Sequence, residues 1–157
     1  MNGARLVLLG LALPLVAAAQ PPAVEVIDEV SQYRTSECAW IDIRFLQAVG
    51  YLGHFPTDHS NQLRISVQLL NRPDALPAGS REAMHVCPKD PFNVRWATFE
   101  AEGQGRGSLY IDFNGETRYK VGQGGDFRSI VISVPSSAGA APCDPGAFRR
   151  NPALEER

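Results

Sequence analysis

Hydrophobic and polar residues alternate along two well-separated stretches of the chain. In AWIDIRF (39–45) every second residue from Ile41 to Phe45 is apolar, and in QLRISVQLL (62–70) so is every second residue from Leu63 onward. Alternation with a period of two over seven or more residues is typical of strands that bury one face. Both stretches are therefore predicted to be antiparallel strands.

The rest of the chain repeats this pattern between glycine-rich turns. SREAMHV (80–86) suggests a helical turn, and AVEVIDEVSQYRTSE (23–37) is compatible with a short strand or a helical turn. Four further segments have strand-like sequence: NVRWATFEA (93–101), SLYIDF (108–113), TRYKV (117–121) and SIVISV (129–134). The pattern as a whole predicts an all-β chain.

An internal repeat organises these strands. IDIRF (41–45) followed by Tyr51 matches LYIDF (109–113) followed by Tyr119, at a constant offset of 68 residues. The same comparison aligns LRISV (63–67) with IVISV (130–134), after deletion of one residue, and Asp58 with Asp126. One such unit with a single apolar face is marginally stable alone. Two copies that pack these faces together predict an antiparallel two-sheet β-sandwich built by internal duplication.

Changes in composition divide the chain into segments. Residues 20–36 form a proline-led N-terminal segment, and residues 37–135 form the predicted sandwich domain. From residue 136 to 157 the chain is rich in Pro, Ala and Gly and has no periodicity. This composition predicts a disordered tail.

The first 19 residues predict export. They hold one cation, Arg5, then an apolar run from Leu6 to Val16 and small residues ahead of Gln20. This is the pattern of a Sec-type signal peptide cleaved near Ala19, and its apolar run is shorter than the ~20 residues that span a bilayer. We expect a periplasmic or secreted protein with no membrane span after cleavage. The net charge of −2 and the lack of a basic cluster argue against nucleic-acid binding.

Three cysteines carry information because the predicted compartment is oxidising. Cys38 and Cys87 both flank predicted strands, so a disulfide between them is the predicted pairing. Cys143 lies in the predicted tail and is expected to be the odd thiol, either free or bonded to another chain.

The glycine-rich stretch YKVGQGGDFRSIVISV (119–134) could form a phosphate-binding loop or a turn between strands. A P-loop places its Lys after the glycines and continues into a helix. Here Lys120 precedes Gly122, and a strand pattern follows. We therefore predict a strand–turn–strand, with Asp58 and Asp126 capping turns at matched positions.

Catalytic chemistry finds little support in the sequence. HFPTDH (54–59) holds two potential metal ligands, His54 and His59, but ordinary loop histidines are favoured because Pro56 makes a helix implausible there. There is no GxSxG motif, and three carboxylates on polar strand faces are expected to be solvated, namely Asp42, Asp112 and Glu116. We predict no cofactor, no catalytic residue and no enzymatic activity.

Aromatic and arginine residues remain as candidates for recognition, because they combine wide contact area with hydrogen-bonding tips. Trp40, Arg44 and Tyr110 have the opposite parity to the apolar set, so they should point outward or into a second packing layer. The candidate binding residues are Trp40, Arg44, Tyr110, Arg118 and Arg128.

Two segments carry a resemblance to a known family. ECAWIDIRF…VGYLGHFPTD…LRISVQLL and LYIDF…TRYKVGQGGDFRSIVISV resemble β-rich modules of proteobacterial envelope proteins that are often followed by tetratricopeptide repeats. The second segment is also similar to the terminal strand pair of AMIN domains. The resemblance covers about residues 37–135 and implies a role like that of AMIN domains, which target amidases and secretins to the cell wall.

Together these features predict a non-enzymatic, exported binding or targeting module of the cell envelope. Its expected partner is peptidoglycan glycan or an envelope protein. The alternatives are an accessory subunit of a periplasmic, secretion or pilus assembly, joined by strand addition or through Cys143, and a small periplasmic metal protein or hydrolase that uses the 54–59 loop.

Overall fold

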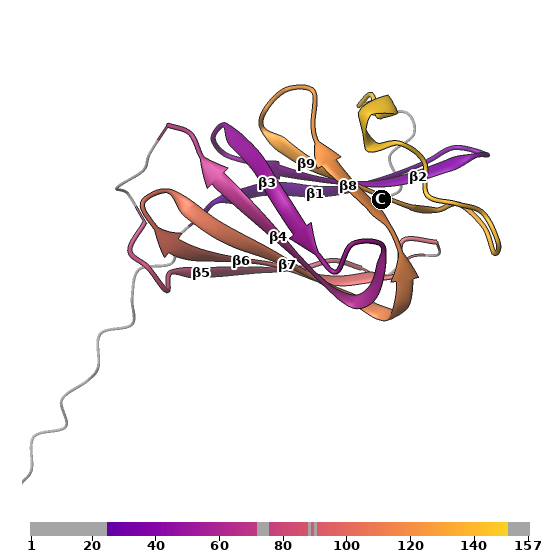
Figure 1. Ribbon diagram of the computed structural model, residues 1–157, viewed down its shortest axis with the longest axis horizontal. Coiled ribbons are helices and arrows are strands. Elements are labelled where there is room, and N and C mark those ends of the chain that lie inside the picture. Colours follow the sequence, from indigo (N-terminus) through magenta and orange to yellow (C-terminus); the bar gives the residue numbers. More distant parts are fainter. Residues whose placement is uncertain (1–24, 72–75, 88, 90, 151–157) are drawn as a thin grey trace, which may run out of the picture.

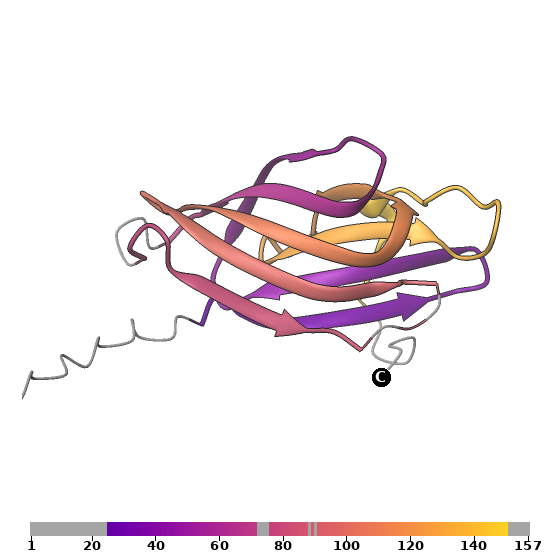
Figure 2. The same cartoon turned by 90° about the horizontal axis from the view of Figure 1, so that it is seen from below.

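The computed structural model describes residues 25–71, 76–87, 89 and 91–150. These residues form two antiparallel sheets that face each other, which confirms the predicted all-β sandwich (Figures 1 and 2). The predicted signal peptide (1–19) and the last seven residues lie outside the described part of the chain. Within that part, no helix is long and apolar enough to cross a membrane.

The two sheets contain four and five strands. In hydrogen-bonded order, sheet A consists of β1 (Ile27–Arg34), β2 (Cys38–Phe45), β9 (Ser129–Pro135) and β8 (Lys120–Gln123). Sheet B consists of β3 (Val49–Phe55), β4 (His59–Leu69), β7 (Arg106–Arg118), β6 (Val94–Gly103) and β5 (Arg81–His85).

The alternating apolar residues form the core between the sheets. Ile41 and Ile132 point inward from sheet A, Leu63 and Ile111 point inward from sheet B, and all four side chains are fully buried. The ring of Phe45 meets that of Phe99 edge-on across the interface. Strand formation follows from this burial, because a period-two apolar pattern can be buried on one face only as a strand.

Strand pairing confirms the internal duplication. In sheet A, Ile41 on β2 lies opposite Ile132 on β9; in sheet B, Leu109 on β7 lies opposite Ile65 on β4. The repeat found in the sequence aligns Ile41 with Leu109 and Ile65 with Ile132, so each pair maps onto the other. Equivalent strands of the two copies therefore lie in opposite sheets. β2 in sheet A matches β7 in sheet B, whereas β3 and β4 in sheet B match β8 and β9 in sheet A.

The duplication also includes β1 and β6, which the sequence comparison did not align. Ile27 on β1 lies opposite Phe45, and Val94 on β6 lies opposite Phe113, with an irregularity in register directly after Ile27 and directly after Val94. The sequence of residues 23–37 was compatible with a strand or a helical turn. Residues Ile27–Arg34 of this segment form β1, a strand of sheet A. The sandwich therefore begins before residue 37.

β5 has no counterpart in the other copy. It pairs with β6 at the edge of sheet B, where the helical turn predicted over 80–86 is wrong. The short alternation of exposed and half-buried residues in this strand was too weak to distinguish from a turn.

The glycine-rich stretch is a strand–turn–strand, as predicted. β8 ends at Gln123, and the turn closes with the Gly124 amide donating to the Ser129 carbonyl at 2.8 Å. Asp126 caps the turn by accepting from the Arg128 amide at 2.9 Å and from the Ser129 hydroxyl at 3.0 Å. The matched Asp58 differs, because its carboxylate contacts His59 instead.

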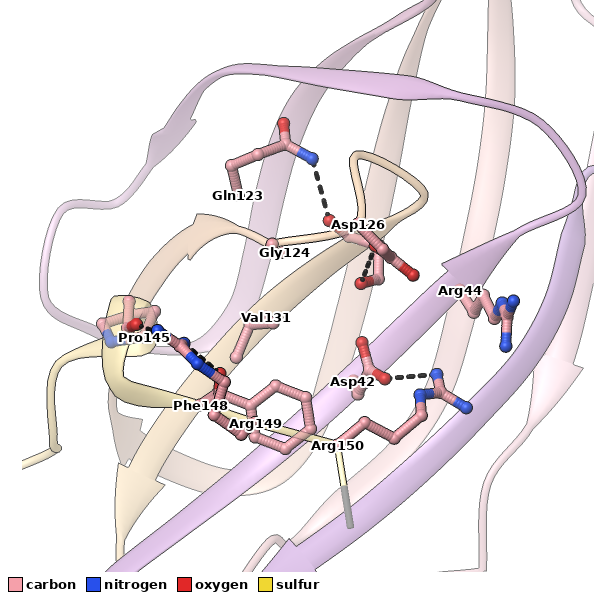
Figure 3. Close-up of a pocket in the computed structure, with 13 residues that line it drawn as sticks. Asp42, Arg44, Gln123, Gly124, Asp126, Val131, Pro145, Phe148, Arg149 and Arg150 are labelled. Atoms are coloured by element: carbon pink, nitrogen blue, oxygen red, sulfur yellow. Dashed lines mark hydrogen bonds and ion pairs between the residues drawn. The ribbon is translucent and has the colours of Figure 1, made fainter. Parts of the chain in front are cut away.

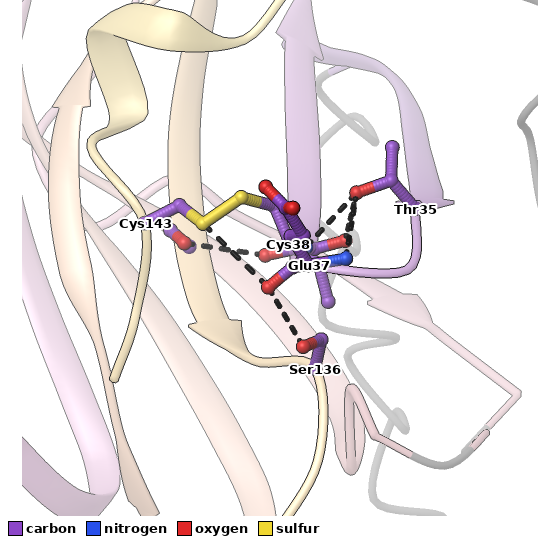
Figure 4. The surroundings of a disulfide bond; sticks show 7 residues. Thr35, Glu37, Cys38, Ser136 and Cys143 are labelled. Atoms are coloured by element: carbon purple, nitrogen blue, oxygen red, sulfur yellow. Dashed lines mark hydrogen bonds between the residues drawn. A yellow bond between two sulfur atoms is a disulfide. The ribbon is translucent and has the colours of Figure 1, made fainter. Parts of the chain in front are cut away.

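The predicted Cys38–Cys87 disulfide is wrong. Cys38 is bonded to Cys143 with a Cα–Cα distance of 5.7 Å (Figure 4). Cys87 is an exposed free thiol. Cys38 begins β2 in sheet A, whereas Cys87 follows β5 in sheet B, so the pairing depends on a tertiary path that spacing alone does not encode. The odd thiol is therefore Cys87, and the expected route to a partner through Cys143 is overturned.

The chain beyond β9 does not run free from residue 136 to 150, where a disordered tail was expected. We call residues 136–150 the C-terminal segment. Its first residue is held by hydrogen bonds from Ser136 Oγ to the Glu37 carbonyl at 2.7 Å and from Arg34 to the Ser136 carbonyl at 3.1 Å. It then returns beside β2, β8 and β9, as Figure 1 shows in yellow.

Candidate functional site

The C-terminal segment forms a second layer on the outer face of sheet A. The ring of Phe148 lies 5.1 Å from that of Tyr33 and 5.7 Å from that of Trp40. These rings and Val131 form a small hydrophobic cluster separate from the main core. Trp40 therefore points away from the main core and packs in a second layer, which is one of the two outcomes that the sequence allowed.

A short 3₁₀ turn, η1 (Pro145–Ala147), fixes the direction of the segment. Asp144 caps it by accepting a hydrogen bond from the Gly146 amide at 2.9 Å, and Pro145 occupies its first position. This local sequence favours such a turn because proline presets the backbone angle and Asp supplies the cap.

A cleft of about 680 Å³ lies between the C-terminal segment and the turn that joins β8 to β9 (Figure 3). Its volume is in the range of small-molecule sites. The floor is formed by Asp42, Arg44 and Val131 from β2 and β9, and the walls by the 123–126 turn and residues 145–150.

Asp42 is the most unusual group in this cleft. Its carboxylate is 1 % exposed, and Oδ2 accepts a hydrogen bond from Arg150 Nη2. Oδ1 has no hydrogen-bond donor among the described residues. Figure 3 shows Oδ2 directed at Arg150 and the other oxygen directed toward the turn that carries Asp126. Burying a carboxylate oxygen costs free energy when no protein donor replaces the hydrogen bonds that it made to water.

The electrostatics of Asp42 and its partners differ. Burial raises the pKa of Asp42 above its ordinary value, and the nearby Arg150 and the Ser129 hydroxyl, which itself donates to Asp126, only partly oppose that shift. A hydrogen bond from Ser31 and then the Arg150 contact lower the pKa of Glu29, which lies 3.1 Å from Arg150 Nη1. Arg150 thus joins two carboxylates, but it leaves the ionised Asp42 incompletely compensated.

The other side of the cleft presents both a donor and an acceptor. Arg44 Nε is buried and has no hydrogen-bond acceptor among the described residues; its nearest carboxylate is Asp28, at 3.6 Å. Burial tends to raise the pKa of Asp126, but the Arg128 amide and the Ser129 hydroxyl outweigh it and lower that pKa. Two residues that line the cleft thus carry buried polar atoms without a hydrogen-bond partner among the described residues: an acceptor on Asp42 and a donor on Arg44.

The five predicted binding residues do not form one site. Arg44 lines the cleft, and Trp40 lies under Phe148 at one side of the same face. Tyr110 lies on the outer face of sheet B, with the Arg64 guanidinium 6.0 Å from its ring centroid. Arg118 is exposed at the end of β7, and Arg128 donates to the carbonyls of Phe45 and Leu46.

Two residues of the cleft were missed in the sequence. Asp42 was expected to be solvated because its parity is outward, and this is wrong because the C-terminal segment covers it. Arg150 was missed because it lies in an aperiodic stretch. The only signal that could have found them is the run PCDPGAF (142–148), whose Cys, prolines and aromatic residue are compatible with a docked segment.

The histidine loop is held by its own hydrogen bonds. His54 Nε2 donates to the Thr57 carbonyl at 3.0 Å, so Nδ1 accepts the hydrogen bond from the Tyr51 hydroxyl. His59 contacts Asp58 and Glu116. Among the described residues, no group of three or more His, Cys, Asp or Glu side chains is placed to hold a metal ion.

No protein-family model, curated protein or solved structure matches the chain.

Proposed function

We propose that this chain is a non-enzymatic, exported module of the cell envelope that binds a fragment of peptidoglycan in the cleft beside Asp42. The observation that carries the proposal is the buried carboxylate of Asp42, a residue that lines the cleft and whose buried Oδ1 has no hydrogen-bond donor among the described residues. A ligand hydroxyl, amide or ammonium group would supply that donor. The AMIN-like resemblance and the predicted signal peptide support the location.

Energetics favour a ligand-binding role for this carboxylate. An ionised group whose pKa is raised by burial destabilises the folded chain at neutral pH. Groups with perturbed pKa values in a cleft are enriched at functional sites for this reason. A ligand that donates to Oδ1 recovers part of the desolvation cost on binding.

The mixed chemistry of the cleft favours a glycan carrying amide groups. Asp42 carries an unpaired acceptor and Arg44 an unpaired donor among the described residues, both buried at the cleft, and the half-buried ring of Phe148 adds an apolar surface. Sugar rings with hydroxyl and acetamido substituents present donors, acceptors and apolar C–H faces at similar spacing. Pockets with a few placed polar groups on an apolar background bind such ligands.

The test is sedimentation of the purified protein with peptidoglycan sacculi. Wild-type protein should pellet with sacculi, and Asp42→Asn should lose about tenfold in affinity, because a hydrogen bond to a charged group is worth about 1.5 kcal/mol or more. Glu116→Gln is the matched control, since Glu116 is an exposed carboxylate at the far end of β7. Equal retention of wild-type and Asp42→Asn, or no retention of wild-type protein, would contradict the proposal.

A further inference from the structure

The outer faces of the two sheets differ in whether another segment covers them. The face of sheet A is covered by the C-terminal segment, whereas no segment within the described residues lies over the face of sheet B (Figures 1 and 2). The duplication makes the contrast sharper. Asp42, on the covered face, is aligned by the repeat with Tyr110, on the open face.

Side chains on the open face form two rows that run across the strands. In the first row Phe55 lies opposite Arg64, Arg64 opposite Tyr110, and Tyr110 opposite Thr98. The second row joins four strands through Gln62, Asp112, Trp96 and His85. Neighbouring strands lie about 4.8 Å apart, so each row spans roughly 15 Å.

Aromatic rings are exposed at both ends of this surface. Phe55 at the β3 edge is 73 % exposed, and Trp96 on β6 is 37 % exposed. His85, on the additional strand β5, holds its ring 4.8 Å from the ring of Trp96 in an edge-on contact. Tyr110 lies between them and is half buried. These rings present a discontinuous apolar strip on a polar sheet.

The charged side chains on this face are of both signs. Arg64 Nη2 bonds to Glu102 at 2.9 Å, and Glu102 also accepts from the Ser108 hydroxyl at 2.6 Å. Gln62 Nε2 donates to Asp112 at 2.9 Å. A surface with charges of both signs and exposed rings offers little net attraction to a highly charged partner. It suits an uncharged ligand with apolar faces and hydroxyl edges.

We propose that the open face of sheet B binds an extended, uncharged polysaccharide chain that crosses the strands along these rows. The rings of Trp96 and Phe55 stack on the C–H faces of sugar units, and Gln62 and Asp112 exchange hydrogen bonds with sugar hydroxyls. This surface is separate from the cleft beside Asp42, and the inference does not depend on the function proposed for that cleft.

Retention on insoluble chitin, an uncharged β-linked polysaccharide, tests this inference. The wild-type protein should bind chitin, and Trp96→Ala and Phe55→Ala should each weaken binding about tenfold, as expected for loss of a large aromatic contact. Leu52→Ala is the matched control, because Leu52 is a 56 % exposed apolar residue of β3 outside both rows. Both ring variants replace exposed side chains and should unfold at the wild-type temperature.

The outcomes separate the two proposals. Asp42→Asn should bind chitin as wild type does, and Trp96→Ala should leave the Asp42-dependent part of sacculus binding intact. Failure of the wild-type protein to bind chitin, or equal binding by wild type and Trp96→Ala, would overturn the inference about sheet B. Retention that disappears between 0.1 and 0.5 M salt, on the order of the range over which charge screening grows strong, would also overturn it, because it would indicate a charged ligand.

Discussion

Arg150 Nη2 donates a hydrogen bond to Asp42 Oδ2 across 108 positions of sequence. The same guanidinium contacts Glu29 at 3.1 Å through Nη1. This contact joins the end of the C-terminal segment to the face of sheet A and completes one wall of the cleft. It also explains how a carboxylate on the outward face of a strand becomes almost fully buried.

Arg150→Ala should destabilise the protein by about 1.5–3 kcal/mol at pH 7, the range for hydrogen bonds to charged groups. The loss arises because the buried Asp42 carboxyl loses the hydrogen-bond donor of its Oδ2. Urea unfolding measures the change in the free energy of unfolding. Arg149→Ala is the matched control, since Arg149 bonds only to the nearby carbonyls of Gly146 and Phe148 among the described residues. In an Asp42→Asn background the Arg150 substitution should cost less; an equal cost would show that the two residues are not coupled.

The raised pKa of Asp42 predicts a specific pH dependence of stability. The folded state prefers the protonated Asp42 carboxyl. Its contribution to the free energy of unfolding is therefore fully present below the ordinary pKa of 3.8, and it is lost as pH rises through the raised pKa of the folded state. Wild-type protein should therefore lose stability relative to Asp42→Asn between acidic and neutral pH. Thermal unfolding of both proteins across this range measures the difference. A wild type that gains stability relative to the variant as pH rises would contradict the account.

The disulfide should hold the C-terminal segment against sheet A. Cys143→Ser releases a bond that spans 105 positions, and the chain-entropy model gives about 4–5 kcal/mol for loops of that size. The expected result is a large fall in the unfolding midpoint under non-reducing conditions. Cys87→Ser is the control and should leave the midpoint unchanged. Alkylation of the native protein followed by mass spectrometry should label Cys87 alone; labelling of Cys38 or Cys143 before reduction would contradict the pairing.

The turn between β8 and β9 offers a pair of adjacent glycines with opposite expectations. A Cβ on Gly124 would lie 2.1 Å from Ser129 Oγ and 2.9 Å from the Ser129 carbonyl, whereas a Cβ on Gly125 meets nothing within 4 Å. Gly124→Ala should cost about 1–3 kcal/mol through overpacking, and Gly125→Ala should be near neutral. Unfolding free energies measure both. Similar values for the two variants would argue against close packing of the turn on Ser129.

The strand pattern and the duplication were predictable because burial of one face imposes a period of two on the sequence. Ile41 and Leu109 occupy matched places in both the sequence repeat and the strand registers. β1 and β6 escaped the comparison because Gln32 on β1 aligns with Phe99 on β6, so the two strands share position but not residue type.

The candidate site was less predictable because it depends on the path of an aperiodic segment. Nothing in the local sequence around Asp42 indicates that Phe148 and Arg150 return to cover it. The same path decides the disulfide, since Cys143 reaches Cys38 only when the C-terminal segment folds back on sheet A. Contacts of this kind are set by tertiary packing rather than by local propensity.

The most direct test of the proposed binding cleft is the pKa of Asp42 itself, measured by carboxyl ¹³C NMR with and without soluble peptidoglycan fragments. Free protein should show a pKa above the ordinary value, because the carboxylate is buried. Saturating ligand should lower it, because a donor at Oδ1 stabilises the charged form. An Asp42 pKa that stays the same while fragments bind, or fragments that fail to bind, would contradict the claim that this carboxylate receives the ligand.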